Sequence, residues 1–346
     1  MGKRCKVMTE RDISRSVTFT WTDKATCMNT WNLVDPELRP ALADSRPLTL
    51  TQDALVTLRQ QRQQAALENV QTFRDIGLTV EEQVISSSDH PPVRVCVLAP
   101  AAPGTQRMGI LHIHGGGHLF GSPEQSLSLT SATVLQHDCV IVSVDYRLAP
   151  ETVFPGSLED CYAALVWMQE QASTLGIHPD HIGLMGDSAG AGLAASLALL
   201  ARDRGGPPLA FQNLMFPMLD DRTATETDPN PVTGEFIWTR EYNHFGWRSL
   251  LGREPGAENI SSYAAPARAT DLHGLPSTWL GVGTLDLFLD ENMRFARQLM
   301  RAGVAVEMAI WPGAYHGFSS DPQARVAQRA REQRQAWIAQ FRPQQN

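Results

Sequence analysis

The sequence element that most constrains the fold is a glycine-rich turn between an apolar run and a run of small residues. The turn consists of Gly186, Asp187, Ser188, Ala189 and Gly190. The apolar run 181–185 before it predicts a buried strand, and the run 191–200 after it predicts a helix. Glycine two residues before and two residues after the serine suits a strained turn where strand and helix approach too closely for side chains. The spacing therefore predicts a strand–turn–helix unit with Ser188 at its apex.

Strands and helices alternate along most of the chain around this unit. Besides 181–185, short apolar and β-branched runs predict strands at 93–98, 109–113, 139–144, 211–216, 278–282 and 305–310. Helical patterns lie at 157–175, 290–302 and 322–341. Such alternation is typical of a mostly parallel sheet with right-handed crossovers. The sequence therefore predicts an α/β fold with a central sheet flanked by helices.

Two stretches interrupt this alternation. Residues 28–78 carry helix-forming runs, and residues 220–275 are polar and proline-rich with several embedded aromatic residues. A loop of the second length without structure is uncommon, so we expect a helical insertion. The predicted division is an extension or disordered segment at 1–27, cap helices at 28–78, a cap insertion at 220–275, and a core formed by 79–219 and 276–346.

Composition narrows the classes of partner and cofactor. The chain has 346 residues and a net charge of −8, without a Lys/Arg-rich block. This argues against binding to nucleic acid or to an anionic membrane surface. No window reaches about 18 apolar residues, so no membrane span is expected. The five cysteines show no CxxC or CxxH spacing, which favours reduced thiols in a cytoplasmic protein over a disulfide framework or a metal site.

A run of three glycines upstream of the serine predicts backbone donors for a developing negative charge. Gly115, Gly116 and Gly117 follow His114, directly after a predicted strand. In a G-x-S-x-G nucleophile elbow such donors stabilise the oxyanion formed during acyl transfer. We assign the oxyanion hole to the N–H groups of Gly116, Gly117 and Ala189. His114 is expected to anchor the loop, and His112 and His118 to be strand or pocket-wall residues.

Two further residues complete a catalytic set downstream. Asp286 ends a predicted strand and His316 follows the last one. The order Ser188, Asp286, His316 is that of an α/β-hydrolase triad, and each residue lies at the carboxyl end of a strand, where such sheets bind ligands. Asp290 is the main alternative acid, but it is expected inside the next helix. Asp187 is expected to act as a carboxylate at a helix N-terminus.

Five motifs, in this order, resemble those of the hormone-sensitive-lipase-like esterases (bacterial family IV). They are His114-Gly115-Gly116-Gly117, Tyr146-Arg147-Leu148-Ala149-Pro150-Glu151, Gly186-Asp187-Ser188-Ala189-Gly190, Asp286-Leu287-Phe288-Leu289-Asp290-Glu291 and His316-Gly317-Phe318. The resemblance runs from about Val80 to the C-terminus and implies an α/β-hydrolase core, a helical cap, hydrolysis of short-chain acyl esters and a possible homodimer. Two positions depart from the family pattern: Ala191 replaces a common glycine and Leu287 a common proline.

The sequence therefore predicts a serine carboxylesterase acting on small-molecule esters through an acyl-enzyme, with no cofactor or metal. An amidase or carbamoyl hydrolase could use the same triad. A true lipase would need an exposed apolar lid, whereas the insertion is polar and mixed. A non-catalytic small-ligand receptor on this fold, as in plant gibberellin receptors, usually lacks a triad member, and this chain has all three.

Overall fold

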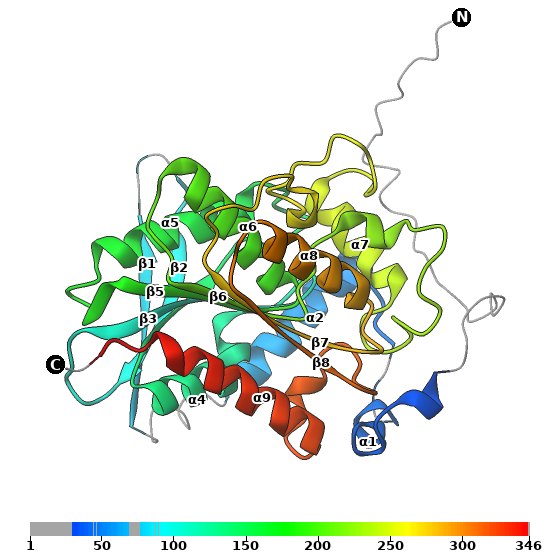
Figure 1. The fold of residues 1–346 in the computed structure, drawn as a ribbon, viewed down its shortest axis with the longest axis horizontal. Helices are drawn as coiled ribbons and strands as arrows, with labels where there is room; N and C mark the ends of the chain where they lie inside the picture. Colours follow the sequence, from blue (N-terminus) through cyan, green and yellow to red (C-terminus); the bar gives the residue numbers. More distant parts are fainter. Residues whose placement is uncertain are drawn as a thin grey trace, which may run out of the picture.

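A computed structural model describes residues 30–344 apart from 44, 46, 69–76, 87 and 89. An eight-stranded sheet with the order β1-β2-β4-β3-β5-β6-β7-β8 runs through the centre, with helices on both faces (Figure 1). The α/β fold with a mostly parallel sheet is thus confirmed. The prediction that residues 1–27 form an extension or disordered segment lies outside the described residues. The division into core and cap stays a prediction.

The strands pair in parallel from β4 to β8, whereas β1 and β2 form the antiparallel edge. Their bounds are β1 Leu78–Ile85, β2 Val93–Pro100, β3 Arg107–Ile113, β4 Val140–Asp145, β5 Ile177–Asp187, β6 Phe211–Met215, β7 Ser277–Gly283 and β8 Val306–Trp311. The sequence analysis did not predict β1. This edge strand carries Glu81 and Glu82 and leaves much of its surface exposed, so its apolar signal is weak.

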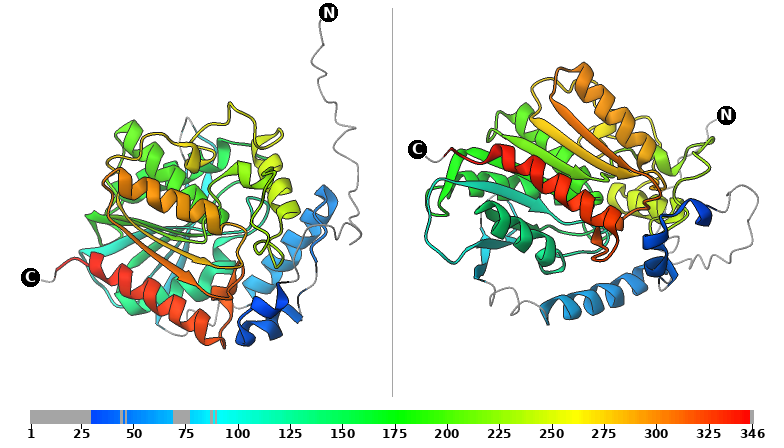
Figure 2. Two further views of the ribbon diagram at one scale, coloured as in Figure 1. Left: turned by 45° about the vertical axis from the view of Figure 1, so that its right-hand side comes forward. Right: turned by 60° about the horizontal axis from the view of Figure 1, so that its bottom comes forward.

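The described part of the chain has eight α-helices, five of which form two layers on the faces of the sheet (Figure 1). Their bounds are α1 Arg39–Ala43, α2 Gln52–Leu67, α4 Leu127–His137, α5 Gly156–Glu170, α6 Ala189–Arg204, α7 Arg240–Leu251, α8 Leu289–Arg301 and α9 Arg325–Ile338. Short 3-10 helices lie at Trp31–Leu33, Pro36–Leu38, Pro123–Ser126, Asp221–Ala224, Pro266–Arg268, Phe318–Ser320 and Ala339–Phe341. Helices α5, α6 and α8 cover one face of the sheet, and α4 and α9 cover the other (Figures 1 and 2). Helix α4 was not predicted.

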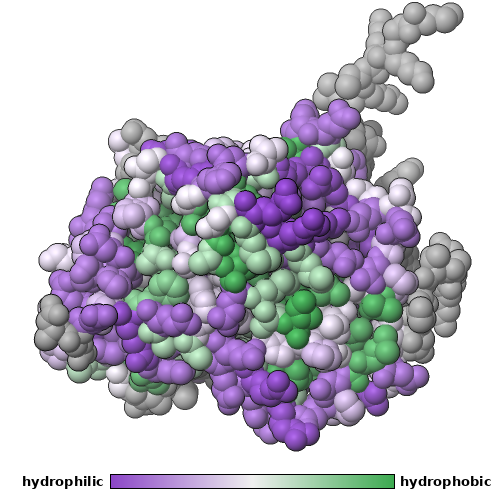
Figure 3. Space-filling model, in the orientation of Figure 1, coloured by the Kyte–Doolittle hydropathy of each residue, from purple (hydrophilic) through white to green (hydrophobic). Residues whose placement is uncertain are grey.

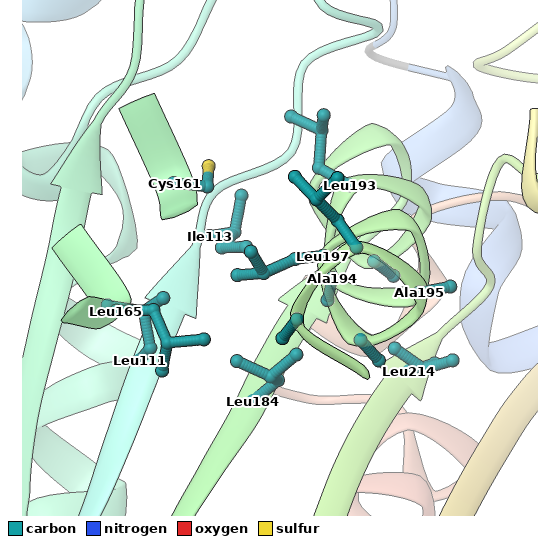
Figure 4. Close-up of a cluster of buried hydrophobic side chains, with 14 of the residues drawn as sticks. Leu111, Ile113, Cys161, Leu165, Leu184, Leu193, Ala194, Ala195, Leu197 and Leu214 are labelled. Atoms are coloured by element: carbon teal, nitrogen blue, oxygen red, sulfur yellow. The ribbon is translucent and has the colours of Figure 1, made fainter. Parts of the chain in front are cut away.

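Each layer has its own apolar core. On the α5–α6–α8 side, Leu111 and Leu184 of the sheet pack against Leu165 of α5 and Leu197 of α6 (Figure 4). The alanines of α6 let this helix lie close to β5, so that the turn joining them is tight. On the other side, residues of α4 and α9 pack on the opposite face of the same strands. The sheet is thereby buried on both faces, as parallel strands require.

The stretch 220–275, expected to be a helical insertion, contains one α-helix, α7, and two 3-10 helices, while most of the remainder is irregular. Polar side chains hold the irregular part. Asp221 is fully buried, pairs with the Arg268 guanidinium at 2.5 Å and accepts a hydrogen bond from the Gly256 N–H at 2.6 Å. Backbone groups satisfied by side chains do not need regular helix, which explains the lower helix content.

Helix α2, within the predicted N-terminal cap, lies across the loop that follows the three glycines. Its Arg59 donates hydrogen bonds to the carbonyls of Leu119 at 2.7 Å and Ala149 at 2.6 Å. The guanidinium of Arg62 lies 4.2 Å from the centre of the Phe120 ring. The helix is therefore attached to the loop largely through arginine contacts.

Candidate active site

Ser188, His316 and Asp286 meet at the carboxyl edge of the sheet. Ser188 Oγ lies 2.8 Å from His316 Nε2, and His316 Nδ1 lies 2.9 Å from Asp286 Oδ2. The three side chains come from the ends of β5, β7 and β8, which run parallel in the sheet. A carboxylate beside Nδ1 favours the ring tautomer protonated there, which leaves Nε2 to accept the serine proton. The other Asp286 oxygen accepts from the Phe288 N–H at 2.9 Å.

The backbone at Ser188 adopts φ 57° and ψ −123°, a strained conformation for a residue with a side chain. Its N–H donates to the Met215 carbonyl at 2.9 Å, and its carbonyl accepts from the Met218 N–H at 3.1 Å. A Cβ at Gly186 would lie 2.6 Å from Gly190 C, and one at Gly190 would lie 2.1 Å from the Ile113 carbonyl oxygen. Only glycine fits both positions, as the sequence spacing predicts.

The three glycines after β3 lie against the serine and the cap. A Cβ on Gly115 would be 2.8 Å from the Asp187 carbonyl oxygen, and one on Gly117 would be 2.0 Å from the ring of Trp238. Gly116 and Gly117 have φ values of 124° and 61°, which side-chain-bearing residues rarely adopt. Bulkier residues could not bring the backbone of this loop so close to Ser188. The predicted third donor is the N–H of Ala189, the first residue of α6.

The histidines near the glycines are buried. The ring of His114 stacks on Tyr146 at 4.2 Å between centres, and its Nδ1 contacts the Gly115 carbonyl at 2.9 Å. Tyr146 donates a hydrogen bond to the His114 carbonyl at 2.8 Å, an arrangement that suits a loop anchor. His112 contacts the Ser143 hydroxyl at 2.8 Å inside the sheet, and burial lowers its pKa to about 3. His118 lies beside Trp247 of α7, with 5.9 Å between ring centres.

Comparison with known proteins places this geometry in a family. Residues 110–320 match the family described as alpha/beta hydrolase fold. The chain belongs to the α/β-hydrolase fold family. Carboxylesterase NlhH of Mycobacterium tuberculosis is 33% identical over 298 residues, covering 82% of this chain and 88% of that protein. An arylesterase of Saccharolobus solfataricus is 31% identical over 250 residues, and the match covers 72% of this chain and 78% of the arylesterase.

Solved structures agree with this assignment. A bacterial heroin esterase superposes with a TM-score of 0.81 at 34% identity, covering 91% of this chain and 100% of its own. Esterase LipW from Mycobacterium marinum gives a TM-score of 0.80 at 32% identity, covering 91% of this chain and 98% of its own. The resemblance to hormone-sensitive-lipase-like esterases that the five motifs indicate is thereby confirmed.

In this α/β-hydrolase, the Arg334 side chain of α9 contacts the turn that carries Ser188. Its guanidinium Nη1 lies 2.7 Å from Asp187 Oδ1, its Nε donates to Asn213 Oδ1 at 2.6 Å, and its Nη2 donates to the Gly186 carbonyl at 3.2 Å. The side chain is fully buried. Asp187 therefore has an ion-pair partner in addition to the helix N-terminus expected from the sequence. A single arginine in an amphipathic helix carries no motif, so sequence reasoning missed it.

Glu291, at the start of α8, binds the segment that follows β6. Its buried carboxylate accepts from the Leu219 N–H at 2.6 Å and from the Thr223 hydroxyl. Burial raises the pKa of Glu291 well above its usual range. The next residue, Asn292, donates to the Pro217 carbonyl at 2.7 Å. These contacts support the segment whose Met218 N–H binds Ser188. Asp290, the alternative acid, lies half-buried in the first turn of α8.

Aromatic rings surround the imidazole of His316. The rings of Phe216, Phe288 and Trp238 lie 4.8, 5.1 and 6.3 Å from it, centre to centre. Such walls exclude water and strengthen the electrostatic contacts inside the site.

Leu287, which stands where the family commonly has proline, packs near Gly234 of the insertion, and Ala191 is fully buried in α6. Neither departure touches the reacting atoms.

A separate groove of about 730 Å³ lies between the 3-10 helix Pro36–Leu38, β8 and α9. It contains none of the three triad residues. Glu37 and Arg325 on its wall form an ion pair at 2.6 Å. The groove lacks the Ser–His–Asp arrangement found at Ser188.

Replacing Arg334 with Met tests how far the elbow depends on α9. The substitution leaves the buried Asn213 amide and the Asp187 carboxylate without their charged partner, and we expect the free energy of unfolding to fall by about 3–5 kcal/mol. Urea unfolding measures the change. The control is Arg331→Met on the same helix. It removes guanidinium contacts to the Ser319 and Asp321 carbonyls but leaves no buried charge without a partner, so it should cost less than Arg334→Met. Equal losses in the two variants would refute a special role for Arg334.

Proposed function

We propose that this chain is a serine carboxylesterase that hydrolyses short-chain acyl esters through an acyl-enzyme intermediate. The observation that carries the proposal is the hydrogen-bonded series from Ser188 through His316 to Asp286, with distances of 2.8 and 2.9 Å. The esterase names of the relatives support the same reaction class.

The proposed reaction has two halves. Ser188 Oγ attacks the ester carbonyl while His316 Nε2 takes the hydroxyl proton, and Asp286 stabilises the resulting imidazolium. The N–H groups of Gly116, Gly117 and Ala189 stabilise the oxyanion. Collapse of the tetrahedral intermediate breaks the bond to the alkoxy oxygen, which receives the proton from His316. Water then attacks the acyl-enzyme by the same route and releases the acid and free Ser188.

The aromatic wall supports a preference for short acyl chains. Trp238 packs directly on Gly117, so its ring occupies space beside a proposed oxyanion donor. The ring is nearly fully buried, and Phe288, which is also buried, closes on His316 from another side. A long acyl chain leaving Ser188 toward this wall would have to displace packed rings.

An amidase using the same triad is the main alternative. Kinetics on an ester and an amide with identical acyl groups would separate the two, since an amidase would cleave the amide with comparable kcat/KM. A lipase would show activity rising sharply above the micellar threshold. A receptor would bind its ligand without turnover.

Two further proposals concern the oligomeric state and the location of the protein. We propose a homodimer formed through the sheet edge at β8, where Met300 of α8 and Ile310 of β8 are 54% and 40% exposed. Figure 3 shows hydrophobic patches among mainly hydrophilic residues on one face. Light scattering of the purified protein would decide the oligomeric state. We also propose a cytoplasmic location, because Cys139 and Cys161 are free and buried.

Neither a membrane-spanning helix nor a metal-binding cluster occurs in the described part of the chain. None of its helices is both long and apolar enough to cross a membrane. Within the same residues, no three His, Cys, Asp or Glu side chains group in a way that could hold a metal ion. The absence of cofactors, of nucleic-acid partners and of membrane association stays a prediction.

Removing the nucleophile tests the proposed chemistry. Ser188→Ala should lower kcat on 4-nitrophenyl acetate by at least about 10⁴-fold, because it removes the hydroxyl that forms the acyl-enzyme. Asp286→Asn should cost about 10⁴-fold because it favours the wrong imidazole tautomer, whereas Asp290→Asn, the matched control, should retain most activity. Retained turnover by Ser188→Ala would overturn the assignment of the nucleophile.

Shortening Trp238 tests the origin of chain-length preference. In Trp238→Ala the space beside Gly117 opens, so kcat/KM for octanoyl and decanoyl esters should rise relative to acetyl, by about tenfold or more for each two to three methylenes newly accommodated. A series of 4-nitrophenyl esters from acetyl to decanoyl measures the shift. Tyr242→Phe is the control: it keeps the ring that lies 6.1 Å from the Trp238 ring, centre to centre, and removes only the hydroxyl. If Trp238→Ala lowers all rates equally, the ring does not set the preference.

A further inference from the structure

Besides His114, whose Nε2 also has no partner, three buried side chains beside the glycine loop carry nitrogen atoms without a hydrogen-bond partner among the described residues. They are His118 with both ring nitrogens, Asn243 with its amide nitrogen and Trp247 with its indole nitrogen. At most 2% of each residue is exposed. Buried polar groups are nearly always paired in native proteins, because leaving them unpaired costs the full desolvation penalty. Four such atoms, on one loop and on the helix packed against it, therefore indicate a bound polar group.

The cluster lies directly against the proposed oxyanion hole. Asn243 and Trp247 are four residues apart on α7 and so share one face of that helix. Gly246 lies on the same face, where a Cβ would be only 2.9 Å from the Gly117 carbonyl oxygen. Because His118 follows Gly117 and lies 5.9 Å from Trp247 between ring centres, helix and loop meet at this point.

Trp238 connects the cluster to the catalytic histidine. Its indole N–H donates to Asn243 Oδ1 at 3.3 Å, which leaves the Asn243 amide nitrogen free to donate elsewhere. The same ring packs on Gly117 and lies 6.3 Å from the His316 ring, centre to centre. We therefore expect the acyl or alkoxy group of a substrate whose carbonyl enters the proposed oxyanion hole to lie on the side of these unpaired nitrogens.

The unpaired atoms are mainly donors. Asn243 and Trp247 offer N–H groups, and burial lowers the pKa of His118 to about 3, so its neutral ring offers one donor and one acceptor. Such a set complements an acceptor oxygen and gains nothing from an alkyl group. An uncharged oxygen fits best, because the buried set carries no positive charge to offset the cost of burying an anion. His118 also has φ 64°, and residues other than glycine in this region cluster at ligand-binding sites.

We propose that His118, Asn243 and Trp247 form a polar subsite selecting esters that carry an uncharged, hydrogen-bond-accepting oxygen a few atoms from the scissile carbonyl. The inference rests on the proposed ester hydrolysis and names the substrate class of that site. An ether, keto or hydroxyl oxygen on the acyl or the alcohol side would satisfy it.

Matched pairs of substrates test the subsite. 4-Nitrophenyl methoxyacetate and butanoate differ by one ether oxygen on the acyl side, and 2-methoxyethyl and butyl acetate differ likewise on the alcohol side. The ratio of kcat/KM within each pair is divided by the ratio of their alkaline hydrolysis rates, which removes intrinsic reactivity. In the wild type we expect the corrected ratio to exceed one in at least one pair. His118→Phe and Trp247→Phe should each lower it about three- to tenfold, the effect of one hydrogen bond.

The control is Trp279→Phe. Trp279 is also fully buried with an indole nitrogen that has no partner among the described residues, but it lies on β7 against Trp311, with 6.0 Å between ring centres. Its replacement should leave the corrected ratio unchanged. Because the readout is a ratio, a general loss of activity does not imitate the effect.

A corrected ratio of one or less in both wild-type pairs, or a ratio that neither variant changes, would overturn the proposal and assign the nitrogens to structural water. If the variants fold poorly, the corrected ratio of the wild type alone decides the outcome. Failure of the proposed function would look different, since the wild type would then not hydrolyse 4-nitrophenyl acetate, or Ser188→Ala would still do so.

Discussion

The strained backbone of Ser188 is the constraint on which the rest of the site depends. A φ of 57° at a residue with a side chain costs about 1–3 kcal/mol and persists only where the surroundings fix it. Here the fixing contacts are the Met215 carbonyl, the Met218 N–H and the close approach of Gly190 to the Ile113 carbonyl. The turn is therefore held by β6 and by the end of β3, and not by its own residues alone.

Distant parts of the chain support the turn and the segment that contains Met218. Arg334 in the last helix binds Gly186, Asp187 and Asn213, and Glu291 and Asn292 at the start of α8 hold the segment that includes Met218. Because α8 begins directly after the loop that carries Asp286, the same helix start positions the acid and supports the nucleophile. The geometry of the three catalytic candidates is thus a property of the sheet and both helix layers together.

Features encoded by local patterns could be predicted from the sequence. Parallel strands are continuous apolar runs, and Ser188, Asp286 and His316 each follow one, so their meeting at one edge follows from the topology. Strand β1 escaped prediction because an exposed edge strand bearing Glu81 and Glu82 lacks such a run. The irregular insertion and the role of Arg334 depend on pairings such as Asp221 with Arg268 and Arg334 with Asp187, which join residues far apart in sequence. No local pattern records those partners.

The enclosure of the site links its catalytic and selective properties. The rings of Phe216, Phe288 and Trp238 keep water from His316, and in that low-dielectric environment each hydrogen bond to the oxyanion has a larger effect than in water. The same environment increases the penalty for any donor left unpaired. An enclosed site next to His118, Asn243 and Trp247 consequently discriminates by polarity as well as by size. A substrate group that is small enough to fit but cannot accept hydrogen bonds would leave those nitrogens unpaired. Its binding would be weaker by the penalty for those buried donors.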